Sequence, residues 1–256
     1  AGPEPLHGTH VAGIIAALDS AGVRGIARNV RIMALRAVPD GDERDKDIAN
    51  AIRYAVDNGA NVINMSFGKA YSPYKHYVDD AVKYADSKGV LMVHAAGNES
   101  ANVDSTASFP TPVYLDGSGR ARNWIEVGAT SWHGKDSLVA TFSNWGKGVV
   151  DIFAPGDDIK STAPGGAYKK ESGTSMAAPV VAGVAALVMS YYPGLSAADV
   201  KRVVLESAYK LGDTKVIRPG EGSDSPVAFG ELSATGGVVN AYNALKRAEE
   251  LSRVRP

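Results

Sequence analysis

Residues 172–189 read SGTSMAAPVVAGVAALVM and contain the longest apolar run of the chain. The run is too short to cross a bilayer and contains Pro179 and Gly183, so we expect a helix buried in a protein core. Its small side chains suit a helix that is contacted on all sides. Ser175 should lie near the helix N-terminus, where unpaired N–H groups and the helix dipole favour negative charge. The alternative is a serine that only caps a core helix.

Outward from this helix, short β-branched runs alternate with helical patterns. We expect buried strands at residues 30–35, 61–65, 90–93, 124–127 and 149–153. We expect helices at residues 7–18, 48–56, 78–85, 200–204 and 238–245, with Asp45 or Asp47 and Ser196 as N-caps and Gly59 and Gly89 as stops. This alternation implies an α/β fold, with a mostly parallel sheet flanked by helices on both faces. We expect a single domain over residues 1–256.

The composition excludes several classes of protein. The 256 residues are 45% hydrophobic, with 27 basic and 28 acidic side chains, which is typical of a globular chain. The balanced charge gives no basic surface for nucleic acid, and no apolar run is long enough for a membrane span. The chain has no cysteine, which excludes disulfides, thiolate metal sites and a cysteine nucleophile.

The stretch HGTHVAG at residues 7–13 opens the first helical pattern. A histidine at a helix N-terminus is held rigidly and can face a cleft as a general base. His7 and His10 also share one side of a helix, so a zinc half-site is an alternative. No HExxH arrangement and no third ligand accompany them. A hydrogen-bonded structural histidine is the third interpretation.

The stretch AAGNE at residues 95–99 directly follows an expected strand. Open α/β sheets bind ligands at the carboxyl ends of their strands. Asn98 can therefore offer a side-chain N–H to an oxygen that gains negative charge. An ordinary Gly-Asn turn is the alternative.

Taken in order, HGTHVAG, AAGNE and GTSMAAP resemble the subtilisin-like serine proteases, the subtilases of peptidase family S8. The resemblance extends to NMSFG at residues 64–68 and to GVVNA at residues 237–241, and it covers the chain from His7 to Ala244. It implies the three-layer subtilisin-like fold. The insert at residues 114–122 and the phrase at residues 40–47 are most similar to subtilases of the Bacteroidetes group.

The resemblance implies a serine endopeptidase that forms an acyl-enzyme on Ser175. His7 is then the general base and later the acid, and Asn98 donates to the oxyanion together with the Ser175 backbone N–H. Substrate-binding residues carried over from the family are Ser66, Phe67 and Gly68 on one wall, Ala95, Ala96 and Gly97 on the other, and Ser108 and Phe109 near the base. The implied partner is a peptide or protein substrate.

The aspartate of the expected triad has no counterpart here. Family members carry it at the end of a strand well before the histidine, whereas Glu4 is too close to His7 and Asp19 lies at the far end of the helix. We therefore expect this strand region to be missing, with the aspartate outside this chain on an upstream segment. The expected partners of the chain, besides substrate, are this upstream N-terminal segment or a propeptide. The alternative is a degenerate form with a rearranged sheet.

Further expectations concern the surroundings of the site. The acidic segment at residues 40–47 is either a solvated loop or a subsite that prefers a basic substrate residue. Many subtilases bind calcium in the loop after the catalytic histidine, but here residues 17–25 form a shorter loop, so we expect no cofactor and no metal site. His94 and His133 are expected to be structural. Secretion, to the periplasm, the cell surface or beyond, follows from the family alone.

Two other functions compete with the endopeptidase. A pseudoprotease or an inactive fragment would bind peptides without turnover, although it would have no need of Ser175, His7 and Asn98 together. A lipase or esterase normally carries its nucleophile in a GxSxG elbow, whereas Met and Ala follow Ser175 here.

Overall fold

A computed structural model describes residues 6–18, 21–38, 43–134, 136–220 and 225–253 of the chain. Its main sheet has the strand order β1-β2-β3-β4-β10-β7. Neighbours from β1 to β10 are parallel, and β7 joins the edge antiparallel. The strands are β1 (Val62–Met65), β2 (Leu91–Ala95), β3 (Trp124–Thr130), β4 (Ile152–Pro155), β7 (Tyr209–Lys210) and β10 (Gly237–Val238).

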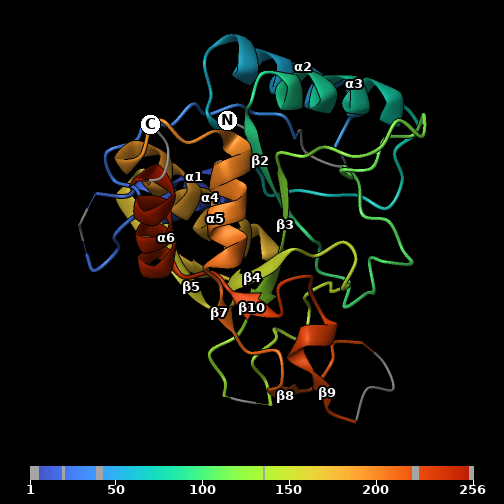
Figure 1. Ribbon diagram of the computed structural model, residues 1–256, viewed down its shortest axis with the longest axis vertical. Helices are drawn as coiled ribbons and strands as arrows, with labels where there is room; N and C mark the ends of the chain where they lie inside the picture. The colour runs from blue at the N-terminus through green and yellow to red at the C-terminus, as the bar shows by residue number, and fades with distance from the viewer. Residues whose placement is uncertain (1–5, 19–20, 39–42, 135, 221–224, 254–256) are drawn as a thin grey trace.

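Helices cover both faces of this sheet and form a three-layer α/β fold (Figure 1). Alternate side chains of β2 explain the two cores, because successive side chains of a strand point to opposite faces. Leu91 and Val93 enter the core with α4, α5 and α6, while Met92 enters the core with α2 and α3. The helices are α1 (Leu6–Ala16), α2 (Asp45–Asp57), α3 (Lys75–Ser87), α4 (Thr174–Tyr191), α5 (Ala197–Glu206) and α6 (Ala241–Arg253).

Two hairpins and two short 3-10 helices complete the described chain. The hairpin of β5 (Ile159–Ala163) and β6 (Ala167–Glu171), joined by η1 (Pro164–Gly166), packs against α1. The second hairpin pairs β8 (Lys215–Val216) with β9 (Val227–Ala228), next to η2 (Phe229–Glu231). A third, smaller core cluster joins Phe153 of β4 to Phe229 of η2.

The expected core helix is α4. By length and composition alone it could cross a membrane, and 61% of its apolar window is buried within the protein. It contacts β1, β2, β3 and β4 as well as α1, α5 and α6. Close approach on several sides explains its small residues: a Cβ on Gly183 would lie 3.0 Å from the Cβ of Ile26.

The expected helix ends were partly right. Ser196 caps α5 in a capping box with Asp199, as predicted. Gly59 follows α2 with φ of 81°, a conformation that glycine adopts without strain. The predicted acidic cap of α2 was wrong, because Arg44 occupies the N-cap position. Asp45 lies in the first turn of the helix, where the helix dipole stabilises a carboxylate.

The expected strand at residues 30–35 is absent: residues 31–38 form neither helix nor strand. Ile32, Met33 and Leu35 are 45%, 40% and 38% exposed. A strand forms only where a neighbour accepts its hydrogen bonds, and the described sheet ends at β1 instead of extending to this segment. The β-branched run therefore has the right residues but no partner.

Two other boundaries differ from the expectations. Of the run at residues 149–153, only Ile152 and Phe153 lie in β4, which continues to Pro155. Val238 belongs to β10 and pairs with Phe153, so the closing helix begins later, at Ala241. Glu4, Asp19, Asp40 and Asp42 lie outside the described residues, and with them part of the predicted calcium-loop and acidic-rim segments.

Candidate functional site

The N-terminus of α4 places the Ser175 backbone nitrogen and the Asn98 side-chain amide around one point. A Cβ atom added to Gly173 would lie 3.6 Å from Asn98 Nδ2 and 3.6 Å from the Ser175 backbone nitrogen. Both nitrogens therefore border one small space, which the glycine leaves open. Donors that meet at one point are suited to stabilise an oxygen that gains negative charge, and the dipole of α4 acts in the same direction.

Thr174 fixes the orientation of the Asn98 amide. Asn98 Oδ1 accepts hydrogen bonds from the Thr174 backbone N–H at 2.8 Å and from the Thr174 hydroxyl at 3.0 Å. Thr174 Oγ1 also accepts from the Gly97 backbone N–H at 3.1 Å. Because a backbone N–H can only donate, the oxygen of the amide faces Thr174 and its NH₂ group faces the open space.

A proline inside α4 links Ser175 to a neighbouring strand. Pro179 has no N–H, so the Ser175 carbonyl, four residues earlier, has no helical partner. The Ser66 hydroxyl donates to that carbonyl at 2.8 Å and accepts from Asn64 Nδ2 at 2.9 Å. The Ser175 hydroxyl donates to the Ser66 carbonyl at 3.2 Å. Two hydrogen bonds thus hold residue 66 against the first turn of α4.

His7 lies at the start of α1 with its surface exposed. Both His7 and Ser175 are described residues, and no hydrogen bond joins them; the Ser175 hydroxyl turns to Ser66 instead. Loss of solvation lowers the pKa of His7, the charge of His10 lowers it further, and Glu171 acts in the opposite direction. A lowered pKa keeps the imidazole neutral, and able to accept a proton, over a wider pH range.

His10 has a different environment from His7. Its side chain is fully buried, with Nε2 at 2.9 Å from the Ile159 carbonyl and 3.0 Å from the Lys169 carbonyl. Both partners accept, so Nε2 carries a proton and ties α1 to the β5–β6 hairpin. In the part of the chain that the structure describes, no group of three His, Cys, Asp or Glu side chains could hold a metal ion. The zinc half-site therefore gains no third ligand.

The two expected pocket walls lie at the carboxyl ends of adjacent strands. β1 and β2 pair with Met65 opposite His94, so the segments that follow lie at the same edge of the sheet. The structure thus brings together Ser66, Phe67 and Gly68 with Ala95, Ala96 and Gly97. Ser108 and Phe109 join them: a Cβ on Gly68 would lie 3.0 Å from Ser108 Oγ, and Lys69 and Phe109 exchange two backbone hydrogen bonds.

Asn144 positions the loop that carries Asn98. Its Nδ2 donates to the Ala96 carbonyl at 2.8 Å and to Glu99 Oε2 at 2.6 Å, and its Oδ1 accepts from two backbone N–H groups of the same loop. Gly97 allows this contact, because a Cβ there would lie 2.3 Å from Asn144 Nδ2. The sequence alone gives neither Asn144 nor Thr174 a role: Thr174 stands within GTSMAAP next to the more conspicuous Ser175, and Asn144 belongs to none of the motifs.

A sequence profile described as the Subtilase family matches residues 2–230. The chain belongs to the subtilase family. It is 42% identical over 211 residues to the Thermophilic serine proteinase of Bacillus sp. (strain AK1), covering 81% of this chain and 48% of that protein. It is 40% identical over 216 residues to Subtilisin BL of Lederbergia lenta, covering 84% of this chain and 74% of that protein. The chain thus spans about half the length of the first relative.

Solved structures of proteases have the same fold as this subtilase. A prenylagaramide maturation protease aligns with a TM-score of 0.73 at 30% identity, over 95% of this chain and 82% of that one. A cold-adapted subtilisin-like serine proteinase aligns with a TM-score of 0.67 at 32% identity, over 90% of this chain and 74% of that one. The fold class and family expected from the three motifs are therefore confirmed.

The acidic segment near the pocket of this subtilase is partly neutralised. Asp45 is buried, pairs with Lys69 at 2.6 Å, and accepts hydrogen bonds from Ser72 and the Tyr74 N–H. Burial alone would raise the pKa of Asp45, but these hydrogen bonds outweigh burial and lower it. Asp45 therefore anchors α2 to the segment after the pocket wall, and its charge is not available to a basic substrate residue.

Proposed function

We propose that this subtilase is a serine endopeptidase acting on peptides or proteins, with Ser175 as nucleophile. Ser175 Oγ attacks a peptide carbonyl while His7 takes its proton, and His7 returns the proton to the leaving amine. Water, deprotonated by His7, then releases the acyl group. The proximity of Asn98 Nδ2 and the Ser175 backbone nitrogen carries the proposal, because two N–H donors at such positions can act together as an oxyanion hole. The chemistry needs no cofactor, since serine, imidazole and amide groups suffice.

The carboxylate that orients His7 comes, in our proposal, from a β-strand that pairs with β1. β1 is an edge strand, and Val62, Ile63 and Asn64 are only half-buried, whereas every residue of β2 and β3 is buried. Asn64 Oδ1 is a buried acceptor without a donor. Every open sheet has two edge strands, and the free backbone N–H and C=O groups of such an edge can pair with a further strand. An upstream N-terminal segment is the expected source of the strand.

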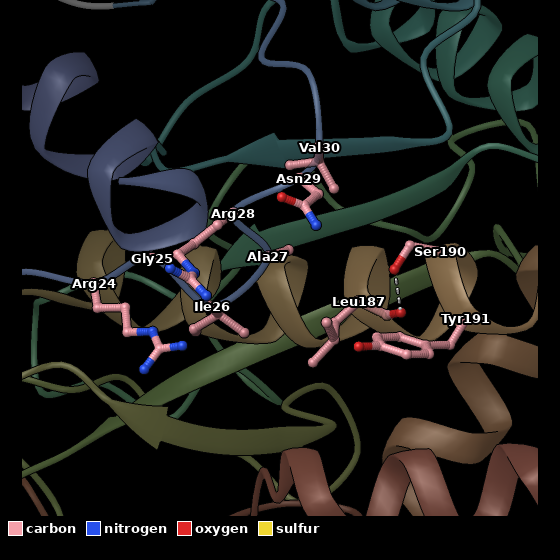
Figure 2. A pocket seen from close by; sticks show the side chains of 10 residues that line it. All are labelled: Arg24, Gly25, Ile26, Ala27, Arg28, Asn29, Val30, Leu187, Ser190 and Tyr191. Atoms are coloured by element: carbon pink, nitrogen blue, oxygen red, sulfur yellow. Dashed lines mark hydrogen bonds between the residues drawn. The ribbon is translucent and has the colours of Figure 1, made fainter. Parts of the chain in front are cut away.

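A cavity supports the view that this side of the molecule accommodates further chain. It has a volume of about 570 Å³ and lies between residues 24–30 and the end of α4, where Leu187 and Tyr191 line it (Figure 2). It is separate from the candidate site, because Ser175 lies at the opposite end of α4, about 24 Å away along a helix of this length. Val30, at its rim, leads directly into residues 31–38, which form neither helix nor strand.

Secretion is proposed on family membership alone. An exported enzyme of this kind would meet its substrates in the periplasm, at the cell surface or in the medium, and the lack of cysteine is compatible with each. A preference for basic substrate residues would rest on Glu43 and on the residues before it, since Asp45 is neutralised by Lys69.

A fluorophosphonate probe tests the nucleophile. We expect the folded chain to be labelled on Ser175 and Ser175→Ala to remain unlabelled, as read by intact mass. A folded chain that is never labelled would favour the pseudoprotease or inactive fragment. Turnover of esters without any cleavage of peptides would favour a lipase or esterase.

A peptide with the sequence of the aspartate-bearing strand that subtilases carry before the histidine tests the open edge. We expect the peptide to slow amide exchange in β1 and to speed labelling of Ser175. In subtilisin, itself a member of this family, losing the triad aspartate lowers turnover by ~3 × 10⁴. This factor is the upper limit of the increase in labelling rate that the peptide can give. The same peptide with Asn in place of its Asp should protect β1 without speeding labelling. Unchanged exchange of β1 with both peptides would contradict the proposed strand.

A further inference from the structure

A buried histidine–glutamate pair lies directly behind one wall of the candidate pocket. His94 in β2 is fully buried, and Glu126 in β3 is its register partner, with 3% of its surface exposed. His94 Nδ1 lies 2.8 Å from Glu126 Oε1, and Trp124 Nε1 donates to Glu126 Oε2 at 2.7 Å. The other imidazole nitrogen, His94 Nε2, lies 2.8 Å from the carbonyl of Phe67.

These partners determine where the protons are. The Phe67 carbonyl can only accept, so His94 Nε2 must carry a proton. The contact between Nδ1 and Glu126 also contains a proton, whether nitrogen or oxygen carries it, because two bare acceptors would repel at 2.8 Å. The Nε2–H donor is thus fixed by Glu126, in the way that a carboxylate fixes the tautomer of a histidine in other sites.

The hydrogen bond from His94 to the Phe67 carbonyl also determines the direction of the next N–H group in the chain. A peptide unit is planar and trans, so the carbonyl of Phe67 and the N–H of Gly68 point in opposite directions. His94 holds the carbonyl toward the sheet, and the Gly68 N–H is thereby turned away from the core. Gly68 is exposed. The neighbouring residues are fixed separately, Ser66 by α4 and Lys69 by Phe109.

We propose that the His94–Glu126 pair positions residues 66–68 for substrate binding, by setting the peptide plane between Phe67 and Gly68. The inference rests on the proposed endopeptidase function. A peptide that binds as an added strand needs backbone donors at fixed positions, and the Gly68 N–H is such a donor. His94 and Glu126 touch neither substrate nor the reacting atoms, so they are positioning residues. They act on extended substrates and not on the chemistry at Ser175.

Two covalent probes of Ser175 separate positioning from chemistry. A small alkyl fluorophosphonate needs only the nucleophile and its surroundings, whereas a succinyl-Ala-Ala-Pro-Phe diphenyl phosphonate must also lie along residues 66–68. The ratio of the two labelling rate constants therefore measures binding along residues 66–68. A defect on the His7 side lowers both rate constants alike and cancels in the ratio. We expect His94→Phe, which keeps a ring but removes the donor, to lower this ratio at least ~10-fold, equivalent to one good hydrogen bond.

Matched variants distinguish positioning from simple stability. Glu126→Gln keeps a side-chain amide that can donate to His94 Nδ1, so the ratio should stay within about twofold of the original. Trp124→Phe removes a donor to Glu126 from the same cluster but leaves the Phe67 contact, so its melting temperature should fall while its ratio is unchanged. If His94→Phe folds and keeps the original ratio, the positioning role is overturned.

The same experiment keeps the two proposals apart. If the original chain reacts with neither phosphonate, the proposed function fails, and the positioning role is then read from equilibrium binding of an uncleavable Ala-Ala-Pro-Phe peptide. Weaker binding by His94→Phe than by Trp124→Phe would still support positioning. Equal binding by both variants, or no binding by the original chain, would overturn it. If His94→Phe does not fold, His94→Gln replaces it in the same measurements.

Discussion

The two halves of the candidate site differ in how completely they are held. In the half around Ser175 and Asn98, hydrogen bonds of Thr174, Ser66 and Asn144 hold together the start of α4 and the segments that follow β1 and β2. In the half around His7, the histidine is exposed, and among the described residues no hydrogen bond joins it to Ser175. The described hydrogen bonds therefore hold the proposed nucleophile and its proposed amide donor, whereas they do not fix the orientation of the proposed base. We therefore expect the nucleophile and the oxyanion groups to be correctly placed even where the base is not.

The largest effect on the labelling rate should come from a substitution in the half around Ser175 and Asn98. We expect Asn98→Ala to lower the labelling rate of Ser175 by ~10²–10³, the loss found on removing one such donor in subtilisin, a member of this family. Thr174→Val, which keeps the backbone N–H but loses the hydroxyl, should lose less than Asn98→Ala. Measured rates of the two variants with the small fluorophosphonate check this order. Equal losses would mean that the hydroxyl, and not the backbone N–H, holds the amide.

The second prediction compares the substitution of leucine by alanine at a buried position and at a partly exposed one. Leu91 of β2 is fully buried, so Leu91→Ala should lower the free energy of unfolding by about 3 kcal/mol. Leu35 is 38% exposed and unpaired, so Leu35→Ala should change it by less than about 0.5 kcal/mol. Urea titrations of the two variants give both values. A large loss at Leu35 would show that residues 31–38 already pack against the sheet.

A smaller effect is expected at the link between β1 and α4. Ser66→Ala leaves the Ser175 carbonyl without a donor and should cost about 1–3 kcal/mol of stability. Pairing that substitution with Pro179→Ala restores an N–H four residues after Ser175, which should recover part of the loss. A double-mutant cycle of urea midpoints measures the coupling. Strictly additive effects would mean that the two residues do not share this carbonyl.

The smallest effect concerns the pH profile of His7. Because loss of solvation lowers its pKa, labelling of Ser175 should keep its full rate down to pH values below ~6.5, the ordinary histidine value, and then fall. A carboxylate brought beside the imidazole by a strand on β1 favours the charged form and raises the pKa, so the acid limb should move to higher pH. Profiles measured with and without the strand peptide test the sign of the shift.

The positions of the chemical groups could be predicted from the sequence because each belongs to a short, local pattern. GTSMAAP placed Ser175 at the first turn of a core helix, and AAGNE placed Asn98 after a strand. The β-branched runs predicted β1, β2 and β3 within a few residues. The failures were at residues 30–35 and at Val238, where local preference favoured one structure and the available neighbours decided another.

The sequence by itself determined the family and the α/β class, and it singled out Ser175 and Asn98 as the proposed nucleophile and amide donor. Only the tertiary structure decided how these groups are held. Thr174 and Asn144 orient the amide, Ser66 takes the carbonyl that Pro179 frees, and His94 with Glu126 fixes the pocket wall. These contacts join residues that are far apart in the chain or lack any motif. A hydrogen bond depends on distance and direction in space, and no periodicity in the sequence encodes either.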